Sequence, residues 1–220
     1  AANVQMASSR KLVIYAALVG NSLIAVMKFF AAFITGSSAM FSEGIHSVVD
    51  TGNQMLLLYG LKQSKKPADD QFPFGHGKEI YFWSFIVAIM IFAVGAGISI
   101  YEGIHRLGNP TAIENIMVNY VVLGLAMVFE GGAWFFALKE FKRAKGDSGY
   151  IEAVHRGKDP SIFVVLFEDS AAMLGLTVAL IATALTQLTG NLYLDGVASI
   201  VIGLILAGTA AWLAVETKSL

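Results

Sequence analysis

Six long apolar segments divide this sequence, and they constrain its fold more than any other feature. The core of a bilayer requires about 20 mostly apolar residues per helix. Six segments meet this length: 12–35, 38–61, 80–104, 113–138, 161–187 and 192–215. All four prolines lie between these segments, as expected for residues that interrupt helices. The runs are too long for strands and lack the alternation of a membrane barrel. We therefore predict an all-α membrane protein with six transmembrane helices, in which residues 1–220 form a single transmembrane domain.

The composition supports a membrane environment. Only 14% of the 220 residues are charged, against about 25% in soluble domains. The net charge of −1 gives no reason to expect a nucleic-acid partner. Cysteine is absent, which excludes disulfides and thiolate metal ligands from this chain. We expect an integral, multi-pass protein of a plasma or inner membrane, surrounded by lipid bilayer.

The basic residues predict the orientation. Of the 15 Lys and Arg residues, two precede the first span, four lie in 62–79, six in 139–160 and one near the C-terminus. The loops on the opposite side contain only Arg106, and Lys28 lies within the first span. Because cytoplasmic loops carry an excess of positive charge, both termini are predicted to be cytoplasmic.

Ionisable side chains interrupt the second and fifth segments, where a bilayer makes them costly. In "SEGIHSVVDTGNQ", His46 and Asp50 are four residues apart and share one helical face. At 1.5 Å per residue, Asp50 lies about 16 Å, and Asp169 about 12 Å, from the inner ends of their spans. If the two spans pack together, His46, Asp50 and Asp169 can converge on one ion near the midplane. Imidazole and carboxylate ligands without thiolate suit Zn²⁺, Co²⁺, Mn²⁺ or Fe²⁺.

Other charged residues within the spans have a structural as well as a functional interpretation. A single histidine in a span is often only hydrogen-bonded to a neighbouring helix, whereas His46 with two aspartates at matched depth favours a metal or proton site. We expect Lys28 to neutralise a carboxylate. Glu43 is interpreted as a wetted entrance residue or a hydrogen-bond partner of His46. For Glu130, between a phenylalanine and two glycines, a packing or water-bound role is favoured.

Stretches along nearly the whole chain together resemble the cation diffusion facilitator family, the proton-coupled exporters of divalent metals. They are "SSAMFSEGIHSVVDTGNQ", "DDQFPFGHGKEIYFWSF", "YEGIHRLGNP", and "FEDSAAMLG" with "LDGVASIVIGLIL". The order, spacing and position of these stretches on the predicted spans make the resemblance specific. It is greatest to the branch with histidine in span 2 and a Glu-Asp pair in span 5, which favours zinc.

The resemblance also implies a ligand set. His46 and Asp50 match the two ligand positions of span 2, and Asp169 matches the second position of span 5. The chain departs from the family at Val165, where many members have a ligating histidine. Four candidates remain for the missing ligand: Glu168, a water molecule, the amide of residue 53, or a carboxylate from another span. We favour Glu168, and the predicted metal ligands are therefore His46, Asp50, Asp169 and Glu168.

The loop before the third span is a candidate for a second metal site. Some relatives bind metal there through an aspartate and two histidines. Asp69 and His76 match this pattern, but Phe72 occupies the intermediate histidine position. An alternative of at least equal weight is that His76 hydrogen-bonds and orders the turn between two glycines.

The resemblance implies a function and an assembly. We expect a transporter, not an enzyme, that exports Zn²⁺, or Mn²⁺, Fe²⁺ or Co²⁺, from the cytoplasm in exchange for protons. The alternatives are a cation channel and an intramembrane metallohydrolase. Family members continue into a cytoplasmic ferredoxin-like domain, which we expect to be absent after "ETKSL" through truncation or as a natural short form. A homodimer is therefore expected to form through the membrane part. Spans 3 and 6, or 2 and 3, are the expected contacts, and the small residues of "GAGISIYEG" permit close packing.

Overall fold

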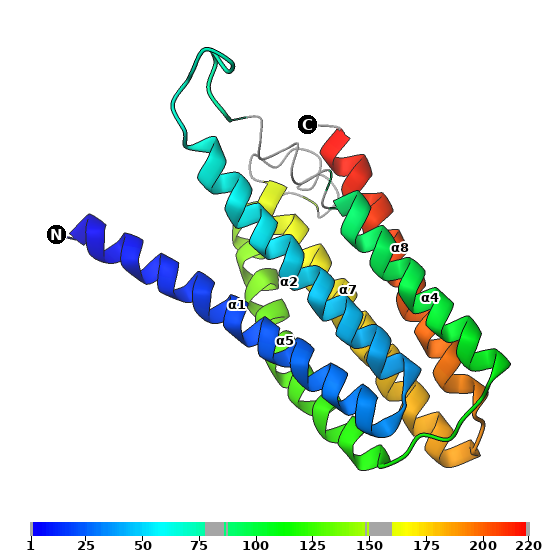
Figure 1. Ribbon diagram of the computed structural model, residues 1–220. Helices are drawn as coiled ribbons and strands as arrows, with labels where there is room; N and C mark the ends of the chain where they lie inside the picture. The colour runs from blue at the N-terminus through cyan, green and yellow to red at the C-terminus, as the bar shows by residue number, and fades with distance from the viewer. Residues whose placement is uncertain (1, 78–85, 87, 148, 150–159, 219–220) are drawn as a thin grey trace.

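The computed structural model describes residues 2–77, 86, 88–147, 149 and 160–218, and it is a helical bundle within these residues (Figure 1). Its elements in chain order are α1 (Ala2–Thr35), α2 (Ser38–Ser64), the π-helical turn η1 (Ala88–Phe92), α4 (Ala93–Gly108), α5 (Ile116–Lys145), α7 (Pro160–Thr189) and α8 (Tyr193–Lys218). No strand occurs in this described part of the chain. The predicted all-α class is confirmed.

Four helices are long and apolar enough to cross a membrane: 15–35, 116–143, 165–189 and 193–215. They match the predicted first, fourth, fifth and sixth spans. α2 has 27 residues and is long enough to cross a membrane, but its polar side chains make it too polar to be counted among these four helices. α4 contributes 16 described residues, and the predicted span 80–104 begins in a segment that lies outside the described residues. The six-span arrangement with cytoplasmic termini therefore stays a prediction.

α2 has a central position in the bundle. It contacts α1, α4, α7 and α8, while α5 packs against α1 and α7. The helices run roughly side by side, and the N-terminal part of α1 extends away from the others (Figure 1). The two expected metal-binding helices, α2 and α7, are therefore neighbours.

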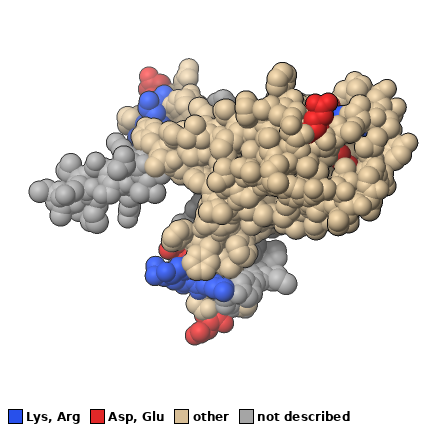
Figure 2. All heavy atoms as spheres, turned by 90° about the horizontal axis from the view of Figure 1, so that it is seen from below, with Lys and Arg blue, Asp and Glu red and all other residues tan. Residues whose placement is uncertain are grey.

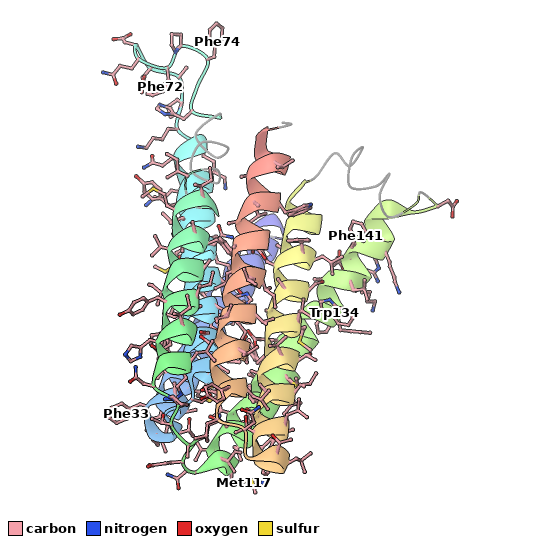
Figure 3. All side chains as sticks on the ribbon, turned by 90° about the vertical axis from the view of Figure 1, so that its right-hand side faces the viewer. Phe33, Phe72, Phe74, Met117, Trp134 and Phe141 are labelled. Carbon is pink, nitrogen blue, oxygen red and sulfur yellow. The ribbon has the colours of Figure 1, made fainter. Side chains whose placement is uncertain are left out.

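The two ends of the bundle differ. We call the end with the short connections at Gly36 and Gly190 the turn end, and the end with the 65–77 loop the loop end. Figure 3 shows Phe33 and Met117 toward the turn end and Phe72 and Phe74 at the loop end. Seen from the turn end, the surface carries few charged side chains (Figure 2).

A hydrogen-bond network closes the turn end. The carboxylate of Asp195 in α8 accepts hydrogen bonds from Ser37 Oγ at 2.7 Å, and from the backbone N–H groups of Ser38 at 2.5 Å and Ala39 at 3.3 Å. Arg106 of α4 lies 3.5 Å from the same carboxylate. An anion at the start of α2 satisfies its free N–H groups and interacts favourably with the helix dipole. Three helices are thereby joined at this end.

α4 and α8 approach each other closely along a line of small residues. Gly95, Ala96, Ser99 and Gly103 of α4 are buried. A methyl group on Gly103 would lie 2.6 Å from the carbonyl oxygen of Gly196 in α8. The small residues of "GAGISIYEG" thus serve packing within one chain, and this use accounts for their presence without a dimer.

Candidate metal centre

A cavity of about 630 Å³ lies between α1, α2, α5 and α7. Its acidic lining residues are Asp50, Glu130, Glu140, Glu168 and Asp169. Glu168 is buried, whereas the side chain of Glu140 is 63% exposed. Glu140 precedes Phe141, which Figure 3 shows on the loop-end side of Trp134. The cavity therefore reaches from the middle of the bundle toward the loop end.

Contacts between α2 and α7 set the relative depth of the predicted ligands. Asn53 donates a hydrogen bond to Glu168. His46, seven residues earlier on α2, lies beside Gly175, seven residues later on α7, because a methyl group there would be 3.4 Å from His46 Nδ1. This antiparallel register puts Asp50 level with residue 171. Asp169 is two residues from that level, about 3 Å along the axis. The predicted match in depth is confirmed.

His46 and Asp50 are brought together, but only Asp50 faces the cavity. Nε2 of His46 lies 3.4 Å from Oδ2 of Asp50, and the exposed fractions of the two side chains are 2% and 19%. Within the described residues, the two ring nitrogens of His46 have no hydrogen-bond partner, and Oδ1 of Asp50 has none either. Unpaired buried polar atoms are costly, so this pair of side chains favours a cation or a proton as an additional partner.

Glu168 and Asp169 both line the cavity from α7. Glu168 also accepts the hydrogen bond from Asn53, so one of its oxygens already has a partner on α2. Val165 lines the same cavity and is 44% exposed. The position at which the chain departs from the family pattern therefore faces the candidate site.

Three of the four predicted ligands, Asp50, Glu168 and Asp169, line the cavity, but the four do not converge on one point. Among the described residues, no group of three or more His, Asp or Glu side chains lies close enough together to hold a metal ion. His46 contacts Asp50 but does not line the cavity. Glu168 is hydrogen-bonded to Asn53. The ligand set His46, Asp50, Asp169 and Glu168 therefore stays a prediction.

A buried ion pair beside the cavity was only partly anticipated. Nζ of Lys28 lies 3.0 Å from Oε2 of Glu43 and 2.7 Å from Ser47 Oγ, and 3.2 Å from Oε2 of Glu130. The expectation that Lys28 neutralises a carboxylate is confirmed. The entrance role for Glu43 was wrong, because its side chain is fully buried and its partner is Lys28 instead of His46. Glu130 has an ionic partner, which the packing or water-bound role expected for it did not include.

Sequence reasoning assigned no function to Glu130, which lines the cavity from a fourth helix. Two signals in the sequence pointed to it. Lys28 is the one Lys or Arg within the predicted spans, and Glu130 is one of eight carboxylates there that could pair with it. What the sequence could not provide was the crossing of α1 and α5, on which their contact depends.

The loop residues Asp69 and His76 form a hydrogen-bonded pair. Asp69 Oδ2 lies 3.0 Å from His76 Nε2, while Oδ1 accepts hydrogen bonds from the backbone N–H groups of Gln71 and Phe72. The hydrogen bond from His76, followed by that from the Phe72 backbone, lowers the pKa of the Asp69 carboxyl. The hydrogen bond expected from the turn-ordering interpretation of His76 is present, and the second metal site stays a prediction. Within the described part of the chain, no third metal-ligating side chain joins this pair.

Comparison with known proteins agrees with the sequence resemblance. Residues 14–220 match the family of the cation efflux transmembrane domain. The chain is 41% identical over 214 residues to the mitochondrial proton-coupled zinc antiporter SLC30A9 of Xenopus laevis, covering 96% of this chain and 38% of that protein. Identity to the human SLC30A9 is 39% over 204 residues, covering 91% of this chain and 36% of that protein.

A plant protein is also similar. The metal tolerance protein C4 of Arabidopsis thaliana is 34% identical over 195 residues, which cover 88% of this chain and 43% of that protein. The chain thus spans well under half the length of these relatives, and what it shares with them is the membrane domain.

Proposed function

The chain belongs to the cation efflux, or cation diffusion facilitator, family, and from this premise we propose that it exchanges Zn²⁺ for protons across a membrane. Its apolar helices make it an integral, multi-pass membrane protein. Two relatives are named proton-coupled zinc antiporters, which supports a transporter in place of an enzyme. The observation that carries the proposal is the cavity between the helices, which Asp50, Glu168 and Asp169 line at similar depth.

The donor chemistry supports zinc as the substrate. Carboxylates together with imidazoles are zinc ligands in catalytic sites, and this chain offers no thiolate. An oxygen-rich wall with Val165 in place of histidine also admits Mn²⁺, Fe²⁺ or Co²⁺. Zn²⁺ is the proposed substrate because it accords with both the donor set and the names of the relatives.

The direction of transport follows from the two ends of the bundle. We propose six spans with cytoplasmic termini, so that the basic loop end faces the cytoplasm. The cavity reaches toward this end past the exposed Glu140, while Asp195, Ser37 and Arg106 join helices at the opposite end. These features favour a conformation that is open to the cytoplasm, from which metal enters the cavity.

The exchange uses the acidic wall and His46. Metal binding requires ionised carboxylates and a neutral imidazole, and so it displaces protons. Asp50 and Asp169 receive the metal from the cytoplasmic side, and His46 lies against Asp50 as a group able to carry a proton. When the bundle opens at the turn end, external protons compete for the same groups and release the metal. The proton gradient then supplies the energy of export.

A flux measurement in proteoliposomes tests this function. The purified chain should drive saturable Zn²⁺ uptake with proton movement in the opposite direction, and an imposed pH gradient should drive Zn²⁺ against its own gradient. Linear, non-saturating Zn²⁺ flux without proton countertransport would instead support a cation channel. Peptide cleavage by the protein in detergent would support an intramembrane metallohydrolase.

Localisation and assembly are also proposals. We predicted a plasma or inner membrane, whereas the names of the relatives give a mitochondrial location. In either membrane, the proposed exchange requires a proton gradient. We retain the homodimer as a proposal, with a contact other than the buried small-residue line of α4, which α8 of the same chain already covers. Cross-linking in membranes, with and without cysteines placed on the exposed Ile98 and Tyr101, tests the outer face of α4 as that contact.

A further inference from the structure

The carboxylate of Glu130 both lines the cavity and contacts a buried cation. It lines the cavity together with Asp50, Glu168 and Asp169, and it lies 3.2 Å from the ammonium of Lys28. Its side chain is 14% exposed, so it forms part of the cavity surface. Among the described cavity-lining carboxylates, it is the one that contacts a buried cation.

Contacts between α5 and α7 give the depth of Glu130. Trp134 Nε1 donates a hydrogen bond to Ser170 Oγ at 2.9 Å, and Gly131 faces Met173. This antiparallel register puts Glu130 level with residue 174, whereas Asp50 is level with residue 171. The difference is about 4.5 Å along the axis at 1.5 Å per residue. The carboxylate of Glu130 thus lies at a depth close to that of Asp50, and both residues line the same cavity.

Lys28 is held more closely by α2 than by Glu130. Its ammonium lies 3.0 Å from Glu43 and 2.7 Å from Ser47 Oγ, against 3.2 and 3.4 Å to the two oxygens of Glu130. Glu43 and Ser47 are four residues apart and present one face of α2 to Lys28. If Glu130 turns away, the ammonium keeps a carboxylate and a hydroxyl as partners. Among these three partners of Lys28, Glu130 is therefore the one that can leave the ammonium to bind another cation.

We infer that Glu130 is a further metal-binding residue of the proposed transport site and that Lys28 is a tethered cation that balances its charge when the cavity holds no metal. This inference rests on the proposed function. A divalent ion at Asp50 and Asp169 draws Glu130 away from Lys28, and the ammonium stays with Glu43 and Ser47. Glu130 would then be the carboxylate from another helix that compensates for Val165, which cannot ligate.

The inference predicts specific changes in Zn²⁺ affinity, measured by equilibrium binding to the purified full chain in detergent. Glu130→Gln removes a ligand while preserving size, and it should weaken Zn²⁺ binding at least tenfold. Glu140→Gln is the matched control, because Glu140 lies on the same helix and lines the same cavity at its exposed mouth. It should change the affinity less than threefold.

A second set of variants tests the tethered cation. Lys28→Gln combined with Glu43→Gln removes the ion pair without changing the net charge, and it frees Glu130 from the ammonium. This pair should tighten Zn²⁺ binding at least threefold. The gain should disappear when Glu130→Gln is added, because Lys28 acts on the metal through Glu130. A purely structural role of the ion pair would produce no gain that depends on Glu130.

Two results would overturn the inference. One is Zn²⁺ binding by Glu130→Gln within threefold of the unmodified chain, and the other is a gain from the Lys28 and Glu43 changes that persists without Glu130. If the Lys28 and Glu43 variant does not give a monodisperse protein, the Glu130→Gln affinity decides alone. Failure of the proposed function is distinct, because the unmodified chain would then show neither Zn²⁺ binding nor Zn²⁺-driven proton flux.

Discussion

Asn53 of α2 donates a hydrogen bond to the carboxylate of Glu168 of α7. This bond joins the two helices that carry the predicted ligands and, with His46 beside Gly175, fixes their register. Asp50 and Asp169 consequently face one cavity at nearly the same depth. The bond also occupies an oxygen of the residue that we favoured as the fourth ligand.

Glu168→Gln tests that fourth-ligand assignment. The glutamine side-chain oxygen still accepts a hydrogen bond from Asn53, so the register is preserved while the negative charge is lost. If Glu168 is a ligand, Zn²⁺ affinity in equilibrium binding should fall at least tenfold. Unchanged affinity would remove Glu168 from the ligand set.

Replacement of His46, Asp50 or Asp169 by alanine should abolish Zn²⁺-dependent proton flux in proteoliposomes, with normal insertion into the membrane. Each change removes a proposed ligand or the group next to it. Thr51→Ala is a suitable control, because Thr51 adjoins Asp50 but its hydroxyl donates to the Ser47 carbonyl of its own helix. Unmodified flux in two of the three alanine variants would contradict the site assignment.

Val165→His should sharpen the preference for Zn²⁺ over Mn²⁺. Val165 lines the cavity one helical turn before Asp169, and imidazole is a better ligand for zinc than for manganese. Competition between the two ions for binding measures the effect. An unchanged ratio of the two affinities would mean that position 165 takes no part in metal selection.

Gly175→Ala should destabilise the bundle by about 1–3 kcal/mol, the usual cost of overpacking. Its methyl group would clash with the Glu43 carboxylate and lie 3.4 Å from His46 Nδ1. Gly131→Ala is the matched control, since its methyl group would lie 3.6 Å from Met173 Cε, an ordinary contact. Thermal unfolding in detergent compares the two. Equal stability of both variants would contradict the close approach of α2 and α7 at Gly175.

The loop pair Asp69 and His76 predicts acid sensitivity outside the membrane. Because the pKa of Asp69 is lowered in the folded chain, its hydrogen bonds contribute stability above the unfolded value of about 4. That contribution is lost as the pH falls through the lowered folded-state pKa. Protection of the 69–76 backbone against hydrogen exchange, relative to the intrinsic exchange rate at each pH, should fall in this acidic range, and Asp69→Asn should lose this protection at neutral pH. Slow exchange in Asp69→Asn would contradict the role of the carboxylate.

The sequence predicted the features that depend on periodicity and charge. Segment lengths indicated the helices, and the four-residue step predicted that His46 and Asp50 share a face. The matched depth of Asp50 and Asp169 followed from helical rise alone. These inferences succeed because each needs only one helix or a count of residues along two.

What the sequence could not predict depends on rotation and crossing of helices. Whether Glu43 faces water or α1 depends on how α2 is rotated, and the structure turns it toward Lys28. The position of His46 behind Asp50, outside the cavity lining, is likewise a matter of rotation. Glu130 and Lys28 are 102 residues apart in the chain. No local sequence pattern can predict a contact between residues so far apart.

The most direct test of the central claim is anomalous diffraction at the zinc edge from crystals of the chain grown with Zn²⁺. The proposed site predicts a peak in the membrane-embedded cavity between α2 and α7, within bonding distance of Asp50 and Asp169 oxygens. A peak only at the loop pair Asp69 and His76, or elsewhere on the surface with none in the cavity, would contradict a transport site between these helices.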